Sequence, residues 1–470
     1  MLASDIQYDK NNTLDDFLEQ IINLYNNGKF KKVIFCSNKY LEKNPPSHKL
    51  YNILGITYNK LNNNKLAFDS YSKAINIEPN FAVSYFNLGL LFHEQNSFER
   101  AIENYKKAIS LNPNYIDAIF NLANVLKENG QYKRAINVYR SLLKKNYNHI
   151  DTHYNLGVIF KEINRLSSSI FHFNEVLKIK SKYIDTFLNL GTVYQKIKNF
   201  EKAIYYYSQE CKINENNYMA YYLMGNAYIE IGDLQTAYQK FQKALQINPK
   251  FFNAFKYLGY IKQKEEDHNL AIQFYKKFLK INPLCSETYN NIGSSYEEKK
   301  EFVKALNYYK NSLKYDPVNY LAHHNMGNVL QKLGELDGAM DSYEKALKIY
   351  PNNAETLLNY GCANLRKGFL KIGFKMYENR FYSKEFICKP PKENLIWDGK
   401  KSLKGKHFFV YDEQGFGDII QFSRYLILLK ERGAKVTFKV REDLHKLLST
   451  IKIDINLISN YPNYEEIDFE

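Results

Sequence analysis

The chain has 470 residues, of which 45% are hydrophobic, and its Lys and Arg excess gives a formal net charge of +15. This length exceeds one ordinary core, so two or three domains or an extended array are expected, and the apolar runs are too short to cross a bilayer. Only nine of the 65 basic residues are Arg, and Lys is scattered along the whole chain, which argues against a nucleic-acid-binding surface.

The start of the chain, MLASDIQYDK, has no apolar segment behind a basic one, so we expect no secretion signal. Five Cys residues are present without a C-x-x-C pair, which indicates free thiols in a reducing, cytoplasmic compartment. No metal or disulfide framework is expected, and no cofactor is indicated.

A unit of 34 residues repeats through most of the sequence. Its first small residue stands at Gly55, Gly89, Ala123, Gly157, Gly191, Gly225, Gly259, Gly293, Gly327 and Gly361. A second small residue follows twelve positions later, at Ala67, Ala101, Ala135, Ser169, Ala203, Ala237, Ala271, Ala305, Ala339 and Gly373. An aromatic ring comes four positions after that, at Tyr71, Tyr105, Tyr139, Phe173, Tyr207, Phe241, Tyr275, Tyr309, Tyr343 and Tyr377.

This pattern predicts pairs of antiparallel helices. A glycine inside a helix costs about 1 kcal/mol relative to Ala, so a small residue kept at one site requires a compensating close contact. The two small residues let the helix backbones approach, the ring fills the space beside them, and Pro at the end of many units stops the second helix.

These positions resemble the tetratricopeptide repeat family, whose unit is a 34-residue helix hairpin. The resemblance covers about 49–377 and implies a mainly α protein, an α-solenoid with a right-handed superhelix and a concave groove. We predict ten such repeats over 48–381 and a degenerate N-terminal capping repeat over 1–47. The repeats around Ser181 and Glu215 lack the Pro, so local irregularity is expected there.

An amide stands two positions before the first small residue in most repeats, and the resemblance implies that this position faces the groove. The amides are Asn87, Asn121, Asn155, Asn189, Asn291, Asn325 and Asn359. Because a carboxamide offers donors and an acceptor, such a row matches a peptide backbone without demanding particular side chains. The N-L-G stretches resemble the repeats of protein O-linked N-acetylglucosamine transferases, which implies a bound polypeptide. The alternative is that these Asn residues are solvated on an exposed helix face.

Two other features of the repeats are candidate sites. The Lys and Asn clamp that some tetratricopeptide proteins use to bind a chaperone carboxylate fits poorly, because Phe120 and Asp185 stand where Lys would be needed. His323 and His324 are adjacent, so they point different ways on a helix, and solvated or groove-lining His is favoured over a metal pair.

After the repeats the sequence predicts a linker over 382–405 and then a small α/β unit over 406–470. His407 to Tyr411 and Lys435 to Val440 read as strands, 419–432 and 441–451 as helices, and 455–459 as a further strand. Alternating strands and helices imply a parallel sheet, a short partial Rossmann-like unit.

A glycine turn, EQGFGD, lies where the first strand ends and the first helix begins. Gly415 and Gly417 would expose backbone N–H groups that suit an anion or a sugar hydroxyl. Asp418 opens the helix and is either a functional carboxylate or only its N-cap.

Trp397 to Gly399, Leu403 to Lys406 and Glu413 to Tyr425 resemble the acceptor lobe of GT-B glycosyltransferases, and the Gly-Asp pair resembles the heptosyltransferases. The resemblance implies that Asp418 is a general base and that Glu413 and Gln414, with the two glycines, shape an acceptor pocket.

Such an enzyme also needs a donor lobe for a nucleotide-sugar, and we expect this sequence to supply none. Two functions therefore stay open: a scaffold that binds an extended polypeptide in its groove, or a glycosyltransferase active only with a donor lobe from elsewhere.

Overall fold

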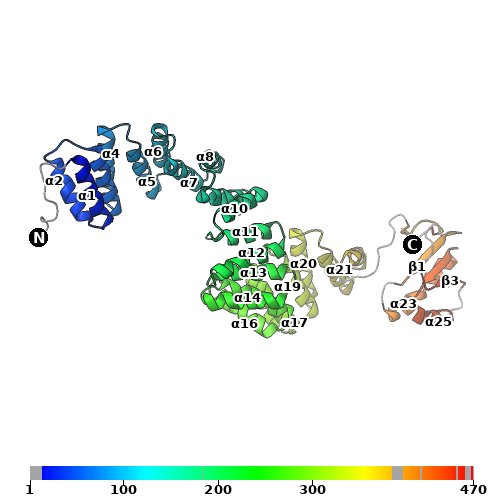
Figure 1. Ribbon diagram of the computed structural model, residues 1–470. Helices are drawn as coiled ribbons and strands as arrows, with labels where there is room; N and C mark the ends of the chain where they lie inside the picture. Colours follow the sequence, from blue (N-terminus) through cyan, green and yellow to red (C-terminus); the bar gives the residue numbers. More distant parts are fainter. Residues whose placement is uncertain are drawn as a thin grey trace. The chain divides into compact units, whose positions relative to one another are not determined.

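The computed structural model describes residues 13–183, 185–383, 395–397, 399–412, 415–450, 454–460 and 467–468. Two compact units divide the chain, Met1–Tyr257 and Leu258–Glu470, and the boundary falls within one helix, α15 (Asn253–Lys264). Both units are mainly helical, and the second also contains a three-stranded sheet (Figure 1).

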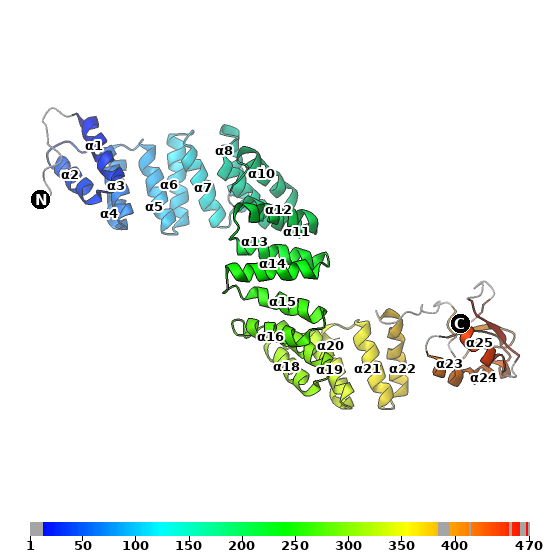
Figure 2. The same ribbon diagram turned by 60° about the horizontal axis from the view of Figure 1, so that its bottom comes forward.

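In the first unit, consecutive helices form pairs, and each pair packs on the next. Figure 2 shows α5, α6 and α7 side by side in chain order. The helices are α1 (Leu14–Asn26), α2 (Phe30–Leu41), α3 (His48–Lys60), α4 (Asn64–Ile77), α5 (Ala82–Glu94), α6 (Phe98–Leu111), α7 (Ile116–Glu128), α8 (Tyr132–Lys145), α9 (Ile150–Glu162), α10 (Leu166–Ile179), α11 (Thr186–Lys196), α12 (Phe200–Ile213), α13 (Tyr218–Glu230) and α14 (Leu234–Ile247).

The second unit continues the same pairing up to the sheet. Its helices are α16 (His268–Leu279), α17 (Ser286–Glu298), α18 (Phe302–Tyr315), α19 (Tyr320–Lys332), α20 (Leu336–Ile349), α21 (Ala354–Arg366) and α22 (Leu370–Tyr377), followed by the 3-10 turn η1 (Glu378–Tyr382). The predicted helix hairpins are therefore confirmed, whereas the right-handed superhelix and the domain boundaries stay predictions.

The close packing of small residue and ring is confirmed at the atomic level. A Cβ added to Gly89 would lie 2.7 Å from the Tyr105 ring, and one added to Gly225 would lie 2.8 Å from the Phe241 ring. Both distances are far below van der Waals contact, so the ring occupies the space that a side chain would need. The rings at this position from Tyr71 to Tyr343 are almost completely buried, so they belong to the core.

The N-terminal hairpin α1–α2 keeps the 34-residue register of the repeats, but its large and small residues stand at exchanged positions. Ile21 stands at the glycine position and Ser37 at the ring position, and both are fully buried together with Val33. A large residue thus stands at the position of the small one, and a small residue stands at the position of the ring. This exchange explains why the sequence lacks the first small residue without losing the hairpin.

One turn geometry joins the two helices of each hairpin. The residue seven positions after the first small residue of each repeat has positive φ. This is the left-handed conformation that glycine adopts at little cost. The positions are Gly28, Asn62, Asn96, Gly130, Asn164, Lys198, Gly232, Glu266, Lys300, Gly334 and Gly368.

The irregularity expected near Ser181 is present, whereas the one near Glu215 is not. Asp185 has φ +55, and α11 begins only at Thr186 and is shorter than the other first helices of the unit. At the second place, α13 begins regularly at Tyr218, and Asn217 caps it by accepting the Ala220 N–H at 3.2 Å.

The C-terminal lobe contains a parallel sheet in the order β1 (His407–Tyr411), β2 (Lys435–Lys439), β3 (Asn456–Ile458). The predicted strands and their parallel order are confirmed, and the assignment to a Rossmann-like half remains a prediction.

The single helix predicted over 419–432 is wrong. It is replaced by α23 (Phe416–Ser423) and α24 (Leu426–Glu431), which are separated at Arg424 and Tyr425, and α25 (Glu442–Leu448) follows β2. The lobe has its own core, in which Phe408 and Val436 of the strands pack with Ile419 and Leu426 of the helices.

Candidate functional site

The predicted row of amides lies on the first helices of seven hairpins, from α5 to α21. Asn87 is buried, and the other six are half-buried. None of the seven is fully exposed, and whether they bind a peptide stays a prediction. The structure also gives several of them a partner that sequence reasoning missed.

Four of the amides bind a second amide in the preceding repeat. Asn155 Nδ2 donates to Asn124 Oδ1 at 3.0 Å, and Asn359 Nδ2 donates to Asn328 Oδ1 at 3.0 Å. Asn87 donates to Asn52 at 3.0 Å and Asn325 to Asn290 at 3.1 Å. These bonds join residues that are 31 or 35 positions apart in the sequence. The signal in the sequence was therefore a second Asn in the preceding repeat. It stands either three positions before or one position after the first small residue of that repeat.

The remaining three amides have different surroundings. Asn121 Nδ2 donates to the carbonyl of Asp117 in its own helix at 2.8 Å. Asn189 Nδ2 donates to the Asp185 carbonyl at 2.9 Å and lies 3.1 Å from the Tyr154 hydroxyl. The third amide, Asn291, forms a hydrogen bond with the Tyr275 hydroxyl. Burial raises the pKa of that hydroxyl, and the bond with Asn291 opposes the rise.

Two lysines complete the polar arrangement in the first unit. Lys127 Nζ donates to Asn155 Oδ1 at 3.1 Å, and Lys161 Nζ donates to Asn189 Oδ1 at 2.6 Å. Both ammonium groups are half-buried, and this burial lowers their pKa. Because each lysine bonds the carboxamide oxygen of the next repeat, it fixes which end of the amide is the acceptor.

Of the two interpretations of the adjacent histidines, the solvated one is wrong for His323, and the groove-lining one stays a prediction. His323 is buried, and its Nε2 lies 3.1 Å from the Pro317 carbonyl. His324 lies 2.8 Å from the Thr356 hydroxyl, and burial lowers its pKa. No group of three or more His, Cys, Asp or Glu side chains suited to a metal occurs in the described part of the chain.

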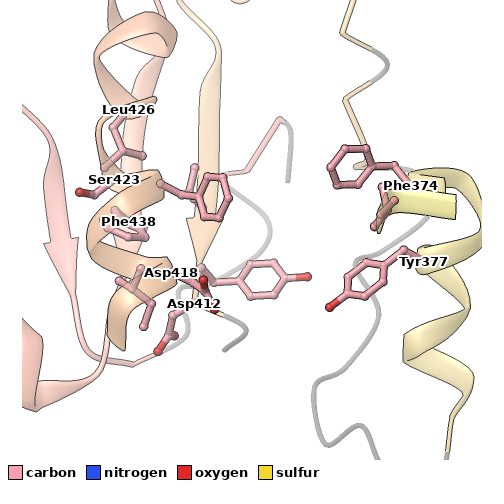
Figure 3. A pocket seen from close by; sticks show the side chains of 12 residues that line it. Phe374, Tyr377, Asp412, Asp418, Ser423, Leu426 and Phe438 are labelled. Carbon is pink, nitrogen blue, oxygen red and sulfur yellow. The ribbon is translucent and has the colours of Figure 1, made fainter. Parts of the chain in front are cut away.

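A second candidate site lies in the second unit, where a pocket of about 470 Å³ contains Asp418. Figure 3 shows Phe374 and Tyr377 of the last hairpin on one side and Asp412, Asp418, Ser423, Leu426 and Phe438 of the lobe on the other. Glu413 and Gln414, predicted to shape an acceptor pocket, lie outside the described residues.

Asp418 is not the N-cap of its helix, which corrects one of the two readings that the sequence allowed. Gly415 occupies the N-cap position and accepts the Asp418 N–H at 3.1 Å, and Asp418 is the third residue of α23 and is exposed.

Neither glycine of the turn is required by the local backbone. Gly415 has φ −59 and Gly417 is helical, and a Cβ added to either would meet no atom within 4 Å. The space beside the turn is therefore open.

Asp412 is a pocket residue that sequence reasoning missed. It follows the last residue of β1, at the carboxyl edge of the parallel sheet, where sites in such folds gather. Its carboxylate is almost fully buried and pairs with Lys439 at 2.7 Å and Arg441 at 3.2 Å. The sequence signal that could have identified Asp412 is its position directly after the predicted strand.

The fold and the amide row define a helical-repeat protein of the α-solenoid class. Models of the tetratricopeptide repeat match 55–96, 89–130 and 123–164, then 150–183, 184–217, 218–251, 258–283, 286–319 and 320–353. These segments together span more than half of the chain, which belongs to the tetratricopeptide repeat family.

Solved structures with a similar fold include three repeat proteins. A tetratricopeptide repeat protein from Parabacteroides merdae is 18% identical, with a TM-score of 0.40, and covers 53% of this chain and 98% of its own. YrrB, described as a TPR protein with an unusual peptide-binding site, is 21% identical, with a TM-score of 0.35 and coverage of 39% and 95%. Yeast Tom70 is 13% identical, with a TM-score of 0.36 and coverage of 78% and 91%.

No curated protein matches the sequence. Within the described residues, no helix is both long and apolar enough to cross a membrane.

Proposed function

We propose that the repeats form a scaffold that binds an extended polypeptide through the carboxamide row. The observation that carries the proposal is that these carboxamides are half-buried and held in fixed orientations, yet only partly used. A carboxamide has two N–H groups and an oxygen with two lone pairs. Asn155 donates to Asn124, hydrogen-bonds the Tyr139 hydroxyl and accepts from Lys127, which leaves one lone pair of its oxygen for a peptide N–H.

The same proposal includes the domain boundaries that the sequence predicts, namely a cap over 1–47, repeats over 48–381, a linker over 382–405 and a lobe over 406–470. It also includes a cytoplasmic location, which the free thiols of the four described cysteines would suit.

The test is binding of blocked synthetic peptides of varied sequence, measured by fluorescence anisotropy. Replacing Asn121, Asn155 and Asn189 together with Ala should weaken binding about tenfold or more, because several peptide groups lose partners at once. Shuffled versions of one peptide should bind the unmodified protein equally well, since backbone groups are recognised.

Asn290→Ala is the matched control, because it removes a cross-repeat amide bond without removing a member of the row. If this control weakens binding as much as the triple variant does, the row acts through stability alone and the proposal fails.

For the lobe, we propose the acceptor side of a glycosyltransferase-like unit in which Asp418 is the general base, with a nucleotide-sugar supplied through a donor lobe from elsewhere. In its favour, Asp418 lines a pocket at the carboxyl edge of the sheet, beside two glycines with open space around them. A carboxylate there could take a proton from an acceptor hydroxyl.

Protein purified from its native cells, which retains any donor lobe, should transfer sugar from a panel of labelled nucleotide-sugars. Asp418→Asn should abolish this transfer, and full activity of the variant would remove Asp418 from catalysis.

A further inference from the structure

Large apolar side chains are exposed on two segments of the second unit, the helix α22 and the segment from α23 to α24. On α22 these are Leu370, Ile372 and Phe374. On α23, α24 and the turn between them they are Phe416, Ile420, Phe422, Tyr425, Ile427 and Leu428. A concentration of this kind on short helices is typical of a surface that another molecule covers.

Side chains of both segments line the pocket of about 470 Å³, which we call the apolar slot. Its walls are Leu365, Phe374 and Tyr377 of the last hairpin and Val410, Ile419, Phe422, Leu426 and Phe438 of the lobe, with Tyr411, Asp412, Asp418 and Ser423 as further polar lining. Phe374 is 58% exposed and Phe422 is 57% exposed. Each presents a mostly uncovered ring to the slot from its own side (Figure 3 for Phe374).

Two carboxylates with different surroundings line the slot. The Asp412 side chain is almost fully buried and is paired with two cations, Lys439 and Arg441. Asp418 is exposed and takes part in no ion pair within the described ranges of the chain. A ligand that fills the slot would therefore meet apolar side chains and one available carboxylate.

We propose that the apolar slot binds an amphipathic helix of a partner protein, with its apolar side chains between Phe374 and Phe422 and a Lys or Arg paired with Asp418. The apolar side chains along one face of a partner helix would fill a slot of this volume. Helices commonly bind to other proteins in apolar grooves of this kind. The slot is the pocket that also contains Asp418, but binding of a helix there requires neither the carboxamide row nor sugar transfer.

The test uses the full chain and a labelled 18-residue model helix of Leu and Lys with one apolar face. Anisotropy should show saturable binding, and Phe374→Ser and Phe422→Ser should each weaken it about tenfold or more. Phe369→Ser is the matched control, because Phe369 is similarly exposed, on the same hairpin, but does not line the slot. Since all three side chains are exposed, folding should be retained, and circular dichroism checks this.

Charge recognition is read from a second peptide in which every Lys is replaced by Glu. It should bind about tenfold more weakly to the unmodified protein, and Asp418→Asn should narrow the difference between the two peptides. The triple Asn variant of the repeats should bind the Leu and Lys helix normally, which separates this proposal from the scaffold function.

Three results would overturn the proposal. The first is no saturable binding, and the second is equal loss in the Phe369→Ser control. The third is a dimer in sedimentation that Phe374→Ser dissociates, because this would assign the slot to a second copy of the chain.

Discussion

At the scale of single residues, the turn between paired helices shows one backbone geometry filled by different residues. Lys300 has φ +58 and Glu266 has φ +61, whereas Gly334 has φ +84 at the same place in its own repeat. For a residue with a Cβ this conformation costs about 1–2 kcal/mol. The repeats therefore carry strain at some turns and none at others.

We predict that Lys300→Gly and Glu266→Gly each stabilise the second unit by about 0.5–1 kcal/mol. Relief of backbone strain exceeds the extra entropy of glycine in the unfolded chain. Gly334→Ala should destabilise it by about 1 kcal/mol. Urea unfolding measures all three variants, and a loss of stability in the two glycine variants would contradict the strain argument.

A pair of histidines, His153 buried and His172 half-buried, makes the first unit sensitive to acid. His153 Nδ1 lies 3.0 Å from His172 Nδ1, and His153 Nε2 lies 2.9 Å from the Tyr147 carbonyl. A carbonyl only accepts, so His153 Nε2 carries a proton, and His172 Nδ1 donates to His153 Nδ1. Burial, with repulsion from His153 and Arg140, lowers the pKa of His172 to about 4, against a small opposing effect of Glu175.

Because the unfolded His172 titrates near 6.5 and the folded one near 4, the unfolded state binds more protons between these values. Stability should therefore be complete above pH 6.5 and fall as the pH decreases towards 4, by on the order of 3 kcal/mol.

The measurement is urea unfolding across this range. His172→Asn can still donate to His153 but does not titrate, so it should flatten the dependence. An unchanged slope in this variant would contradict the assignment.

At the scale of elements, packing inside one hairpin could be predicted from the sequence, because the small residues and the ring are at fixed separations along the chain. Gly89 and Tyr105 illustrate this: their contact follows from the 34-residue pattern alone. The partners of the amides could not be assigned in the same way. Asn124 accepts a hydrogen bond from Asn155 only because adjacent repeats stack with a particular offset between their first helices. That offset is a property of the tertiary structure.

The lobe shows the same limit. Its strands follow from apolar runs, but the break between α23 and α24 carries neither Gly nor Pro, so no local signal marks it. Residue type alone allows Asp418 to be the N-cap of its helix, but in the structure the N-cap is Gly415.

The exchanged pair in α1–α2 leads to a prediction about hairpin packing. Gly225→Ile should clash with Phe241, and Phe241→Ser should leave a cavity, each costing about 2–4 kcal/mol. The double variant reproduces the arrangement of Ile21 and Ser37, so it should cost about 1–3 kcal/mol less than the sum of the single variants.

Thermal and urea unfolding measure this coupling. Gly225→Ile combined with Phe173→Ser, in separate hairpins, should be additive. Additivity of the matched pair as well would show that Ile21 and Ser37 are not a transferable solution.

At the scale of the whole molecule, each hairpin packs mainly on its neighbours in the chain. Stability in such an array is approximately a sum of the stability of each repeat and of its contacts with adjacent repeats. A local defect should therefore lower protection locally and spread only to adjacent hairpins. This differs from a single cooperative core, in which one defect lowers the protection of all buried amides alike.

Gly157→Val tests this expectation, because even a Cβ at Gly157 would lie 2.7 Å from the Phe173 ring. We predict faster amide hydrogen exchange in α9 and α10, a smaller increase in α8 and α11, and no change in α3 or α19. Hydrogen exchange read by mass spectrometry resolves these helices. If exchange increased equally in α3 and α9, the repeats of the first unit would unfold together, and the nearest-neighbour description would not hold for this chain.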